Sequence, residues 1–398
     1  EIIGAGDTYF NTLNFDRNGV EFVPNKNGAF VRRGQRGDYC LVAAAPLDTA
    51  NVSFARKEMN KLFVINGNTI TTPTYRIVIG SDGSIESLYH LLSDRELVAG
   101  PFNQLCLYDD KPGNYDAWDI LPNYAENVRP LQVLSPLKLT AVSGGCVEFT
   151  VVEGTEKSRI ERKIRLHFSG EHDVTPVFEV EVIADWHESH KLLKVEFAPN
   201  VLTRELTCDT SAGFIKRPMH KNTSWEAARF ECCTHKWFDL SETNGGVAVI
   251  NDGKYGVGIG ERSVTLSLLR ATERPDPQSD LGRHVFCYLI VPHGDDPVFD
   301  GINRKALVFN APLVRTAPVH VNRELQALLD TVSDRLHLQA LKRSEDGTKN
   351  ICRLIETDGR RGSIKLGKTV TVTDLLERPL CETDTLSYKP FEIITIAF

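Results

Sequence analysis

Short runs of apolar, or alternating apolar and polar, residues separated by turn residues make up most of this chain. Their period of two, with β-branched and aromatic residues inside and Gly, Asp, Asn and Pro between, is typical of β-strands. The clearest runs cover residues 74–79, 146–152, 160–168, 177–183, 192–197, 247–250 and 285–291. Only one helix of any length is predicted, near residues 322–329. The pattern therefore indicates an all-β fold built from sandwiches rather than βαβ units.

Two changes in composition divide the chain into three predicted domains. Residues 66–73 are polar and rich in turn residues, and residues 297–312 are marked by Pro and Asn. We therefore predict a small β-sandwich over residues 1–68, a large central one over 69–303 and a C-terminal one over 304–398. These sizes are usual for β domains.

Charge and hydropathy exclude several classes of partner. The 398 residues carry a net charge of −7, so we expect no binding to nucleic acid or to an anionic membrane surface. No run reaches the ~20 apolar residues that cross a bilayer, and no signal-peptide pattern opens the chain. Because the first residue is Glu1 rather than Met, we expect the chain to be a piece of a longer protein.

The number and spacing of the cysteines predict the cellular compartment of the protein. There are nine of them, an odd number, scattered along the chain, which is unlike a disulfide framework. We therefore expect reduced thiols and a cytoplasmic protein. The vicinal pair Cys232 and Cys233 has no C-x-x-C motif or helix N-terminus to lower its pKa values, so both are interpreted as small apolar strand residues.

A series of short strings, taken in order, resembles the β region of the family 38 glycoside hydrolases, which are α-mannosidases. The strings are 82–88 (DGSIESL), 94–98 (DRELV), 109–119 (DDKPGNYDAWD), 185–197 (DWHESHKLLKVEF), 217–225 (RPMHKNTSW), 228–231 (ARFE), 235–242 (HKWFDLSE), 251–256 (NDGKYG) and 266–271 (LSLLRA). Tyr115 departs from the family pattern, in which tryptophan is commoner. Flanking strings at 10–13, 341–346 and 391–395 extend the resemblance over nearly the whole chain, and it is greatest to the cytosolic-type members.

The resemblance implies a division of labour. The central sandwich is expected to be a β-supersandwich like that of galactose mutarotases. Members of the family hydrolyse terminal α-linked mannose with retention, using zinc held by an N-terminal α/β barrel and a helical bundle that this chain lacks. We therefore expect no cofactor and no catalytic residue in this chain, which would serve as scaffold and active-site rim. The partners implied are the missing barrel and α-mannosides or mannose-containing glycans, and the chain alone would be inactive.

The first candidate sugar contact lies at residues 115–119. Trp118 stands between Asp116 and Asp119 and follows Tyr115. Sugar C–H faces stack on aromatic rings while hydroxyls bond carboxylates, so these four residues are candidates for the substrate rim. In the alternative interpretation Trp118 belongs to the core and the aspartates cap a turn after Pro112.

A second concentration of polar and aromatic residues follows about 100 positions later. It comprises His220, Asn222, Trp225, Arg229, His235, Lys236 and Asp239. Strand alternation would put Arg229, Glu231 and Cys233 on one face. These residues either contact the missing barrel at the rim of its active site, or form structural ion pairs, Arg229 with Glu231 or Lys236 with Asp239.

Histidine spacing gives no metal site. His293 and Asp295 form a His-x-Asp pair, but zinc needs three or four converging ligands. His187 and His190 near His172 are three apart, and residues at that spacing in a strand point to opposite faces.

Three functions compete at this point. The chain is a fragment of an α-mannosidase, a stand-alone carbohydrate-binding module using Trp118 and Trp225, or a mutarotase that pairs His220 or His235 with a glutamate. If the chain is a fragment, the surface that contacts the barrel in the whole enzyme is exposed to solvent. In that case we expect the chain to form a homo-oligomer in solution.

Overall fold

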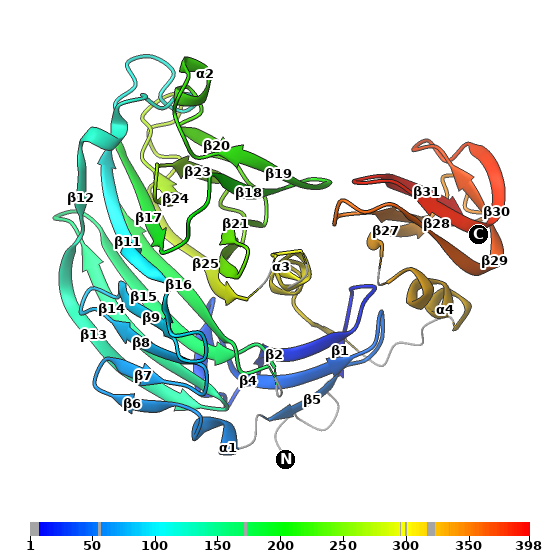
Figure 1. Ribbon diagram of the computed structural model, residues 1–398, viewed down its shortest axis with the longest axis horizontal. Coiled ribbons are helices and arrows are strands. Elements are labelled where there is room, and N and C mark those ends of the chain that lie inside the picture. The colour runs from blue at the N-terminus through cyan, green and yellow to red at the C-terminus, as the bar shows by residue number, and fades with distance from the viewer. Residues whose placement is uncertain are drawn as a thin grey trace.

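The centre of the molecule is a nine-stranded antiparallel sheet in the computed structural model, which describes residues 8–54, 57–170, 173–294, 296–298, 301–316, 323–333 and 335–398. In spatial order its strands are β13 (Gln132–Ser143), β14 (Cys146–Gly154), β15 (Arg159–Phe168), β16 (Pro176–Trp186), β25 (Gly282–His293), β22 (Gly245–Asn251), β21 (Trp237–Glu242), β18 (Glu205–Thr210) and β19 (Gly213–Pro218). The sheet curves across the large lobe of the molecule (Figure 1).

Two smaller sheets complete the central sandwich. A six-stranded sheet has the order β12 (Val128–Pro130), β11 (Val98–Asp109), β17 (Lys191–Pro199), β24 (Val264–Arg270), β23 (Gly256–Ile259) and β20 (Glu231–Cys233). A five-stranded sheet has the order β10 (Arg95–Glu96), β9 (Ile85–His90), β8 (Tyr75–Ile79), β7 (Thr69–Thr71) and β6 (Val64–Asn66). Side chains of all three sheets form one core cluster that includes Phe149, Trp186 and Phe197.

The two faces of the nine-stranded sheet differ in chemistry. Alternate residues such as Phe149, Ile164 and Val180 lie in the core cluster, whereas their neighbours on the opposite face include a buried charged row. The register places Glu148 beside Arg165 and Arg165 beside Glu179. Period-two alternation therefore positions an apolar face and a charged face on the same strands.

The N-terminal segment packs on the charged face. It contains a sheet of β2 (Arg17–Pro24), β4 (Gln35–Ala44) and β3 (Phe30–Arg32), with β5 (Asn51–Phe54) paired to β4, and then α1 (Lys57–Asn60). β1 (Thr8–Phe10) pairs with β26 (Val314–Thr316), far along the chain. β6, which precedes the predicted boundary at residue 68, pairs with β7, which follows it. The three-domain division stays a prediction.

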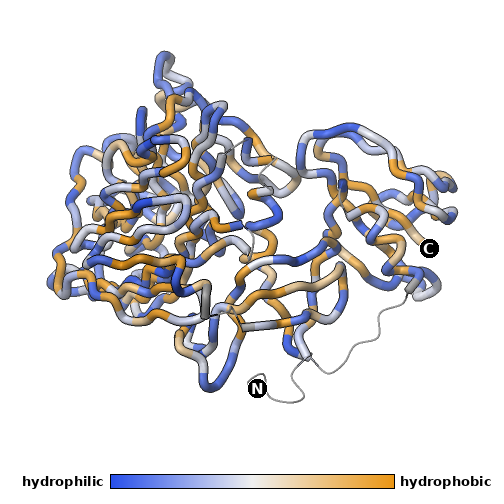
Figure 2. The backbone as a smooth tube through the Cα atoms, turned by 60° about the horizontal axis from the view of Figure 1, so that its bottom comes forward, coloured by the Kyte–Doolittle hydropathy of each residue, from blue (hydrophilic) through white to orange (hydrophobic). Residues whose placement is uncertain are grey.

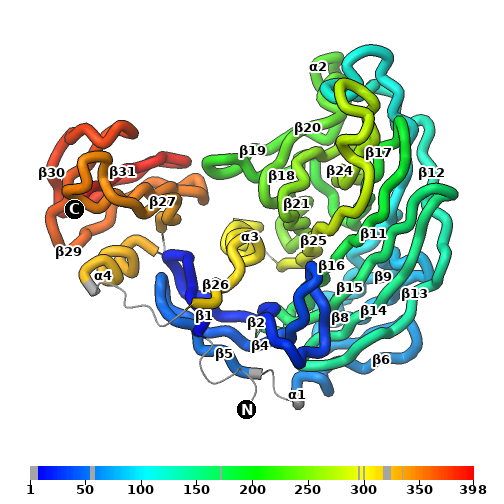
Figure 3. The backbone as a smooth tube through the Cα atoms, turned by 180° about the vertical axis from the view of Figure 1, so that it is seen from behind, coloured from blue at the N-terminus to red at the C-terminus, as the bar shows by residue number. Residues whose placement is uncertain are grey.

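The C-terminal sheet forms a separate small lobe, seen from behind in Figure 3. Its order is β27 (His337–Arg343), β28 (Asn350–Ile355), β31 (Ile393–Ala397), β29 (Gly362–Thr373) and β30 (Pro379–Tyr388). With α4 (Arg323–Val332) and Leu47 of the N-terminal segment it builds a second apolar core. Hydrophobic stretches run through both lobes (Figure 2). The Asn14 side chain joins it to the N-terminal segment, donating to the Leu336 carbonyl at 2.8 Å and accepting from the Leu338 N–H at 2.9 Å.

The all-β prediction is confirmed, and each of the seven predicted runs overlaps a strand (β8, β14, β15, β16, β17, β22 and β25). The helix predicted near 322–329 corresponds to α4, although residue 322 lies outside the described residues. The expectation of one helix was wrong, because α3 (Ile302–Asn310) is also present. α3 fully buries only Ile302 and Ala306, and two apolar contacts give little periodicity in the sequence. Within the described part of the chain no helix is long and apolar enough to span a bilayer.

Candidate functional site

Four loops meet at one end of the central sandwich, which we call the loop end. They are residues 110–127, 187–190, 219–230 and 271–281. The Asp110 N–H donates to the His190 carbonyl at 2.9 Å, and the His190 N–H donates to the Ala271 carbonyl at 2.7 Å. Tyr124 from the first loop contacts Phe230 from the third. The loop of 110–127 (cyan) and α2 (Ser224–Ala227) lie together at the top of Figure 1.

Large aromatic side chains project from the loop end into solvent. Tyr115 is 70% exposed, Trp118 72% and Trp225 79%. The interpretation of Trp118 as a core residue was therefore wrong, because the loop that carries it lies outside the sandwich. Exposed tryptophans are costly to leave in water and are enriched at binding surfaces.

The two aspartates of this loop bind backbone rather than each other. Asp116 is buried and accepts from the N–H groups of Glu273 at 2.7 Å and Arg274 at 3.2 Å. The hydrogen bond from Glu273 lowers the pKa of Asp116. The Asp119 carboxylate accepts from the next N–H, that of Ile120, at 3.1 Å. Neither aspartate therefore supplies the acid–nucleophile pair of a glycosidase, which requires two carboxyls facing one cleft.

A partly buried ion pair holds the base of the same loop. Arg270 at the end of β24 contacts Asp110 at 2.6 Å and donates to the Asp119 carbonyl at 2.8 Å. Burial raises the pKa of Asp110, and the Arg270 charge opposes this shift. The exposed aromatic rings of this loop are thus carried on a backbone held from both sides, which limits the entropy lost when they bind a partner.

The third loop is ordered by a capping box. The Thr223 side chain accepts from the Glu226 N–H, and the Glu226 carboxylate accepts from the N–H groups of Asn222 at 2.9 Å and Thr223 at 3.0 Å. His220 lies 3.3 Å from the same carboxylate. These contacts fix the short helix that presents Trp225.

The expected strand through Arg229 was wrong, because β20 begins at Glu231 and Arg229 lies in the exposed turn after α2. The predicted Arg229–Glu231 pair is therefore also wrong. Glu231 instead bonds to the ammonium of Lys194 and accepts from the Tyr124 hydroxyl at 2.5 Å. Sequence separation concealed this network, whose members come from two strands, β17 and β20, and from the loop that carries Tyr124.

The remaining candidates lie at the start of β21 on the nine-stranded sheet. Lys236 pairs with Asp209 at 2.8 Å, and Asp239 pairs with His293 at 2.7 Å in the buried interior. The predicted Lys236–Asp239 pair was thus wrong. The His235 ring packs against Tyr255.

The described histidines do not form a metal site. Within the described ranges, no three His, Cys, Asp or Glu side chains converge as a metal-binding group. His187 contacts Asp185 at 2.8 Å and His190 contacts Glu273 at 3.2 Å. Asp295 and His172 lie outside the described residues.

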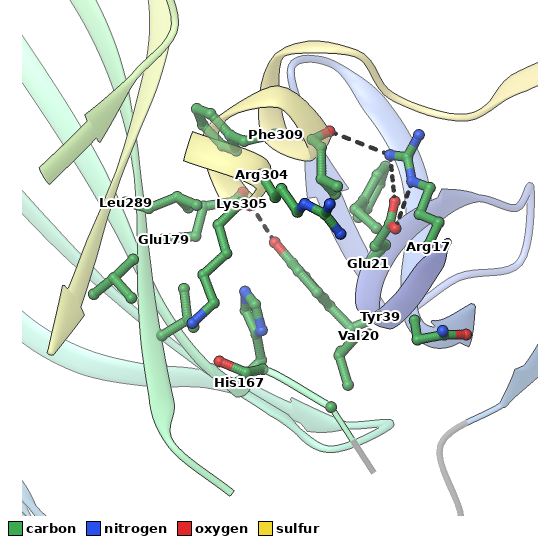
Figure 4. A pocket seen from close by; sticks show the side chains of 18 of the residues that line it. Arg17, Val20, Glu21, Tyr39, His167, Glu179, Leu289, Arg304, Lys305 and Phe309 are labelled. Carbon is green, nitrogen blue, oxygen red and sulfur yellow. Dashed lines mark hydrogen bonds and ion pairs between the residues drawn. The ribbon is translucent and has the colours of Figure 1, made fainter. Parts of the chain in front are cut away.

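A cavity of about 280 Å³ lies between β2, the charged face of the nine-stranded sheet and α3. Its polar lining includes Arg17, Glu21, Tyr39, His167, Glu179 and Lys305, shown in Figure 4. Sequence reasoning missed it because its walls come from three distant segments of the chain.

The cavity has a histidine and a glutamate on a curved sheet, the pair that a mutarotase would need. Burial would raise the pKa of Glu179, but the charges of Arg32 and Arg165 lower it to about 2. Burial lowers the pKa of His167. Glu179 also accepts from the Tyr39 hydroxyl at 2.9 Å and from Arg32 at 2.7 Å. A general acid or base needs a pKa near the working pH, so this locked pair is structural.

Comparison with known proteins identifies the family. The profile of the glycosyl hydrolases family 38 C-terminal domain matches residues 70–278, more than half of the chain. The chain belongs to glycosyl hydrolase family 38. The profile of the family 38 C-terminal beta sandwich domain matches residues 335–396, which cover the C-terminal sheet. Both matches confirm the resemblance seen in the sequence.

Curated relatives agree with this assignment, and a solved structure shares the fold. The chain is 31% identical to alpha-mannosidase 2C1 of Homo sapiens over 349 residues, covering 82% of this chain and 33% of that protein. It is 29% identical to alpha-mannosidase G of Dictyostelium discoideum, covering 81% of this chain and 32% of that protein. The crystal structure of an alpha-mannosidase from Enterococcus faecalis V583 matches 98% of this chain and 56% of its own, with a TM-score of 0.71 at 14% identity. The chain thus spans about a third of the length of these curated relatives.

Proposed function

We propose that this chain is the C-terminal β region of an α-mannosidase that hydrolyses terminal α-linked mannose. In this proposal the sandwich is a scaffold for the catalytic part, and the loop end forms part of the active-site rim and contacts sugar. The observation that carries it is the set of exposed rings, Tyr115, Trp118 and Trp225, held on loops with fixed backbones. A ring that is exposed yet preorganised suits stacking on a pyranose face.

Zinc belongs, in this proposal, to the catalytic part outside this chain. A zinc site needs three or four converging ligands, and the described residues offer no such group. The residues present therefore do not fit a zinc ion, and no step of the chemistry is assigned to this chain.

We also propose that the protein works in the cytoplasm and that the separated chain self-associates. All nine cysteines are free thiols, which suits a reducing compartment. Along β13, an edge strand of the nine-stranded sheet, Leu134, Leu139 and Val142 are each more than 40% exposed. Exposed apolar edges favour association with another copy.

The first test is hydrolysis of a chromogenic α-mannoside by this chain alone and by the longer protein, each with and without added zinc. We expect turnover only from the longer protein, because a glycosidase needs a carboxyl pair across the scissile bond. Zinc-dependent turnover by the chain alone would contradict the proposed division of labour. Binding of mannobiose by the chain alone, measured by calorimetry, would instead support a carbohydrate-binding module.

The second test replaces Trp118 and Trp225 by alanine in the longer protein. Loss of a stacking ring costs on the order of 1 kcal/mol, so we expect each substitution to lower kcat/KM for an oligomannoside about fivefold. Leu375→Ala, at an exposed site on the small lobe, is the matched control and should leave kcat/KM unchanged.

If the variant with both Trp118→Ala and Trp225→Ala keeps the kcat/KM and the Tm of the unsubstituted protein, the loop end does not contact the substrate. The scaffold role would survive that result, since it rests on the sandwich rather than on the rings.

A further inference from the structure

Two cysteines from different sheets face each other across the central sandwich. Cys208 on β18 is fully buried in the core cluster, and Cys232 on β20 packs against the same cluster. The two segments meet here, because the N–H of His235, three residues after Cys232, donates to the carbonyl of Asp209, next to Cys208, at 3.1 Å. The interaction between the two thiols raises the pKa of Cys208 and lowers that of Cys232. β20 is the edge strand of the six-stranded sheet, and β18 lies one strand from the edge of the nine-stranded sheet. The two cysteines therefore lie between the two sheets, near the edges formed by β19 and β20.

A guanidinium group stands beside this pair. Arg217 on β19 donates from Nη2 to the Cys233 carbonyl at 3.0 Å. Its Nε is buried and has no hydrogen-bond partner among the described residues. The charge of Arg217 acts on both thiols. A cationic donor beside a thiol pair is suited to stabilise a thiolate.

The vicinal residue Cys233 is not part of this contact. Neighbouring residues of a strand point to opposite faces, and Cys233 is exposed while Cys232 turns toward the core. The Cys233 thiol donates to the Thr234 carbonyl at 3.5 Å. A Cys232–Cys233 bridge would also disturb the pairing of Cys232 with Val257 and of Cys233 with Gly256. The partner of Cys232 is thus Cys208, distant in sequence.

We propose that Cys208 and Cys232 are a site of reversible oxidation, at which a hydroperoxide converts the two thiols to an inter-sheet disulfide. The attacking thiolate is that of Cys232, which is less buried than Cys208. A hydrogen bond from the Cys208 thiol, and then the Arg217 charge, lower the pKa of Cys232, while burial opposes them. Cys208 keeps its proton as the donor.

The reaction balances with hydrogen peroxide as the oxidant. The Cys232 sulfur attacks one peroxide oxygen, the O–O bond breaks, and hydroxide leaves with the proton of Cys232 as water, giving a sulfenic acid. The Cys208 sulfur then attacks the Cys232 sulfur. The S–S bond forms, the S–O bond breaks, and the second water carries away the Cys208 proton. Two thiols lose two electrons and the peroxide gains them.

The bridge would close the loop 209–231, which carries α2 and Trp225. Because a disulfide restricts the unfolded chain and both cysteines lie at the same core cluster, we expect a higher Tm in the oxidised form, by roughly 5 °C. This inference does not depend on the proposed function.

The test treats the purified chain with a small excess of hydrogen peroxide, blocks remaining thiols with iodoacetamide and maps tryptic peptides without reduction. Trypsin leaves Cys208 within 205–216 and Cys232 with Cys233 within 230–236. We expect these two peptides to be joined, and to separate after dithiothreitol. C233S, the matched control, should keep the bridge, and C208S and C232S should lose it. In C208S, dimedone should trap sulfenic acid on Cys232.

A bridge between Cys232 and Cys233, or over-oxidation of Cys232 with no bridge in the unsubstituted chain, would overturn the proposal. A second measurement needs no cysteine change. Arg217→Gln should slow bridge formation at pH 7 about threefold or more and shift its rate–pH profile to higher pH, since the thiolate loses the positive charge of Arg217. An unchanged rate–pH profile would show that Arg217 does not stabilise the thiolate.

Discussion

Replacing Arg165 by methionine is expected to lower the free energy of unfolding by about 3–5 kcal/mol, as measured by urea denaturation. The Arg165 guanidinium is fully buried and contacts Glu148 at 2.8 Å, Glu179 at 3.1 Å and Glu181 at 2.7 Å. It also donates to the Val31 carbonyl at 2.7 Å. Removing it leaves buried carboxylates of like charge close together without their common partner.

Lys163→Met is the matched control. Lys163 lies on the same strand and face, but its ammonium is 4.0 Å from Glu161 and partly exposed, so we expect a loss below about 1 kcal/mol. Adding Glu181→Gln to Arg165→Met should recover part of the lost stability, because one uncompensated charge is removed. A loss below about 1 kcal/mol for Arg165→Met would show that water reaches this row and screens it.

His337 is expected to make the protein less stable in mild acid, by about 2–3 kcal/mol between pH 7 and pH 4.5. Its ring on β27 is buried, and its Nδ1 has no hydrogen-bond partner among the described residues. Burial, then the charges of Arg304 and Lys236, lower the pKa of His337 from 6.5 to about 4. Between these values the unfolded chain binds a proton that the folded protein does not, so stability is complete above pH 6.5 and is lost as the pH falls toward 4.

Comparison with His337→Gln isolates this effect. The variant lacks the titrating ring, so its free energy of unfolding should fall less between pH 7 and pH 4.5. The free energy of unfolding of the unsubstituted protein should fall by about 2–3 kcal/mol more than that of the variant over this range. His187→Gln, at an exposed loop position, should follow the unsubstituted protein at every pH. Parallel curves for His337→Gln and the unsubstituted protein would show that His337 is protonated equally in both states.

The strands and the family could be predicted because both depend on local order along the chain. In runs such as 160–168, side chains point alternately to the two faces of the sheet, as they do in the paired strand. This period of two in the sequence is enough to predict the position of β15. Burial of a single side chain does not follow from such a pattern. Trp118 stands in a turn-rich loop with no periodicity, and its exposure depends on where that loop leaves the sandwich.

Charge partners were harder to predict for a related reason. Lys236 pairs with Asp209 and Asp239 with His293, both across strands from other parts of the chain. A sequence presents near neighbours such as Lys236 and Asp239 as the obvious pair, whereas in a sheet the partners are set by register between strands. The cavity could not be predicted for the same reason, because its walls come from β2, β15 and α3, which are distant in sequence.

Asn14 contacts Leu336 and Leu338, more than 300 residues further along the chain. A ribosome adding about 5–20 residues per second needs roughly 15–60 s to make that stretch. During this interval the Asn14 amide has no final partner, and neither does β1, which awaits β26. In a nascent chain, β1 and the backbone around Asn14 therefore stay accessible to chaperones and proteases until synthesis of the small lobe is under way.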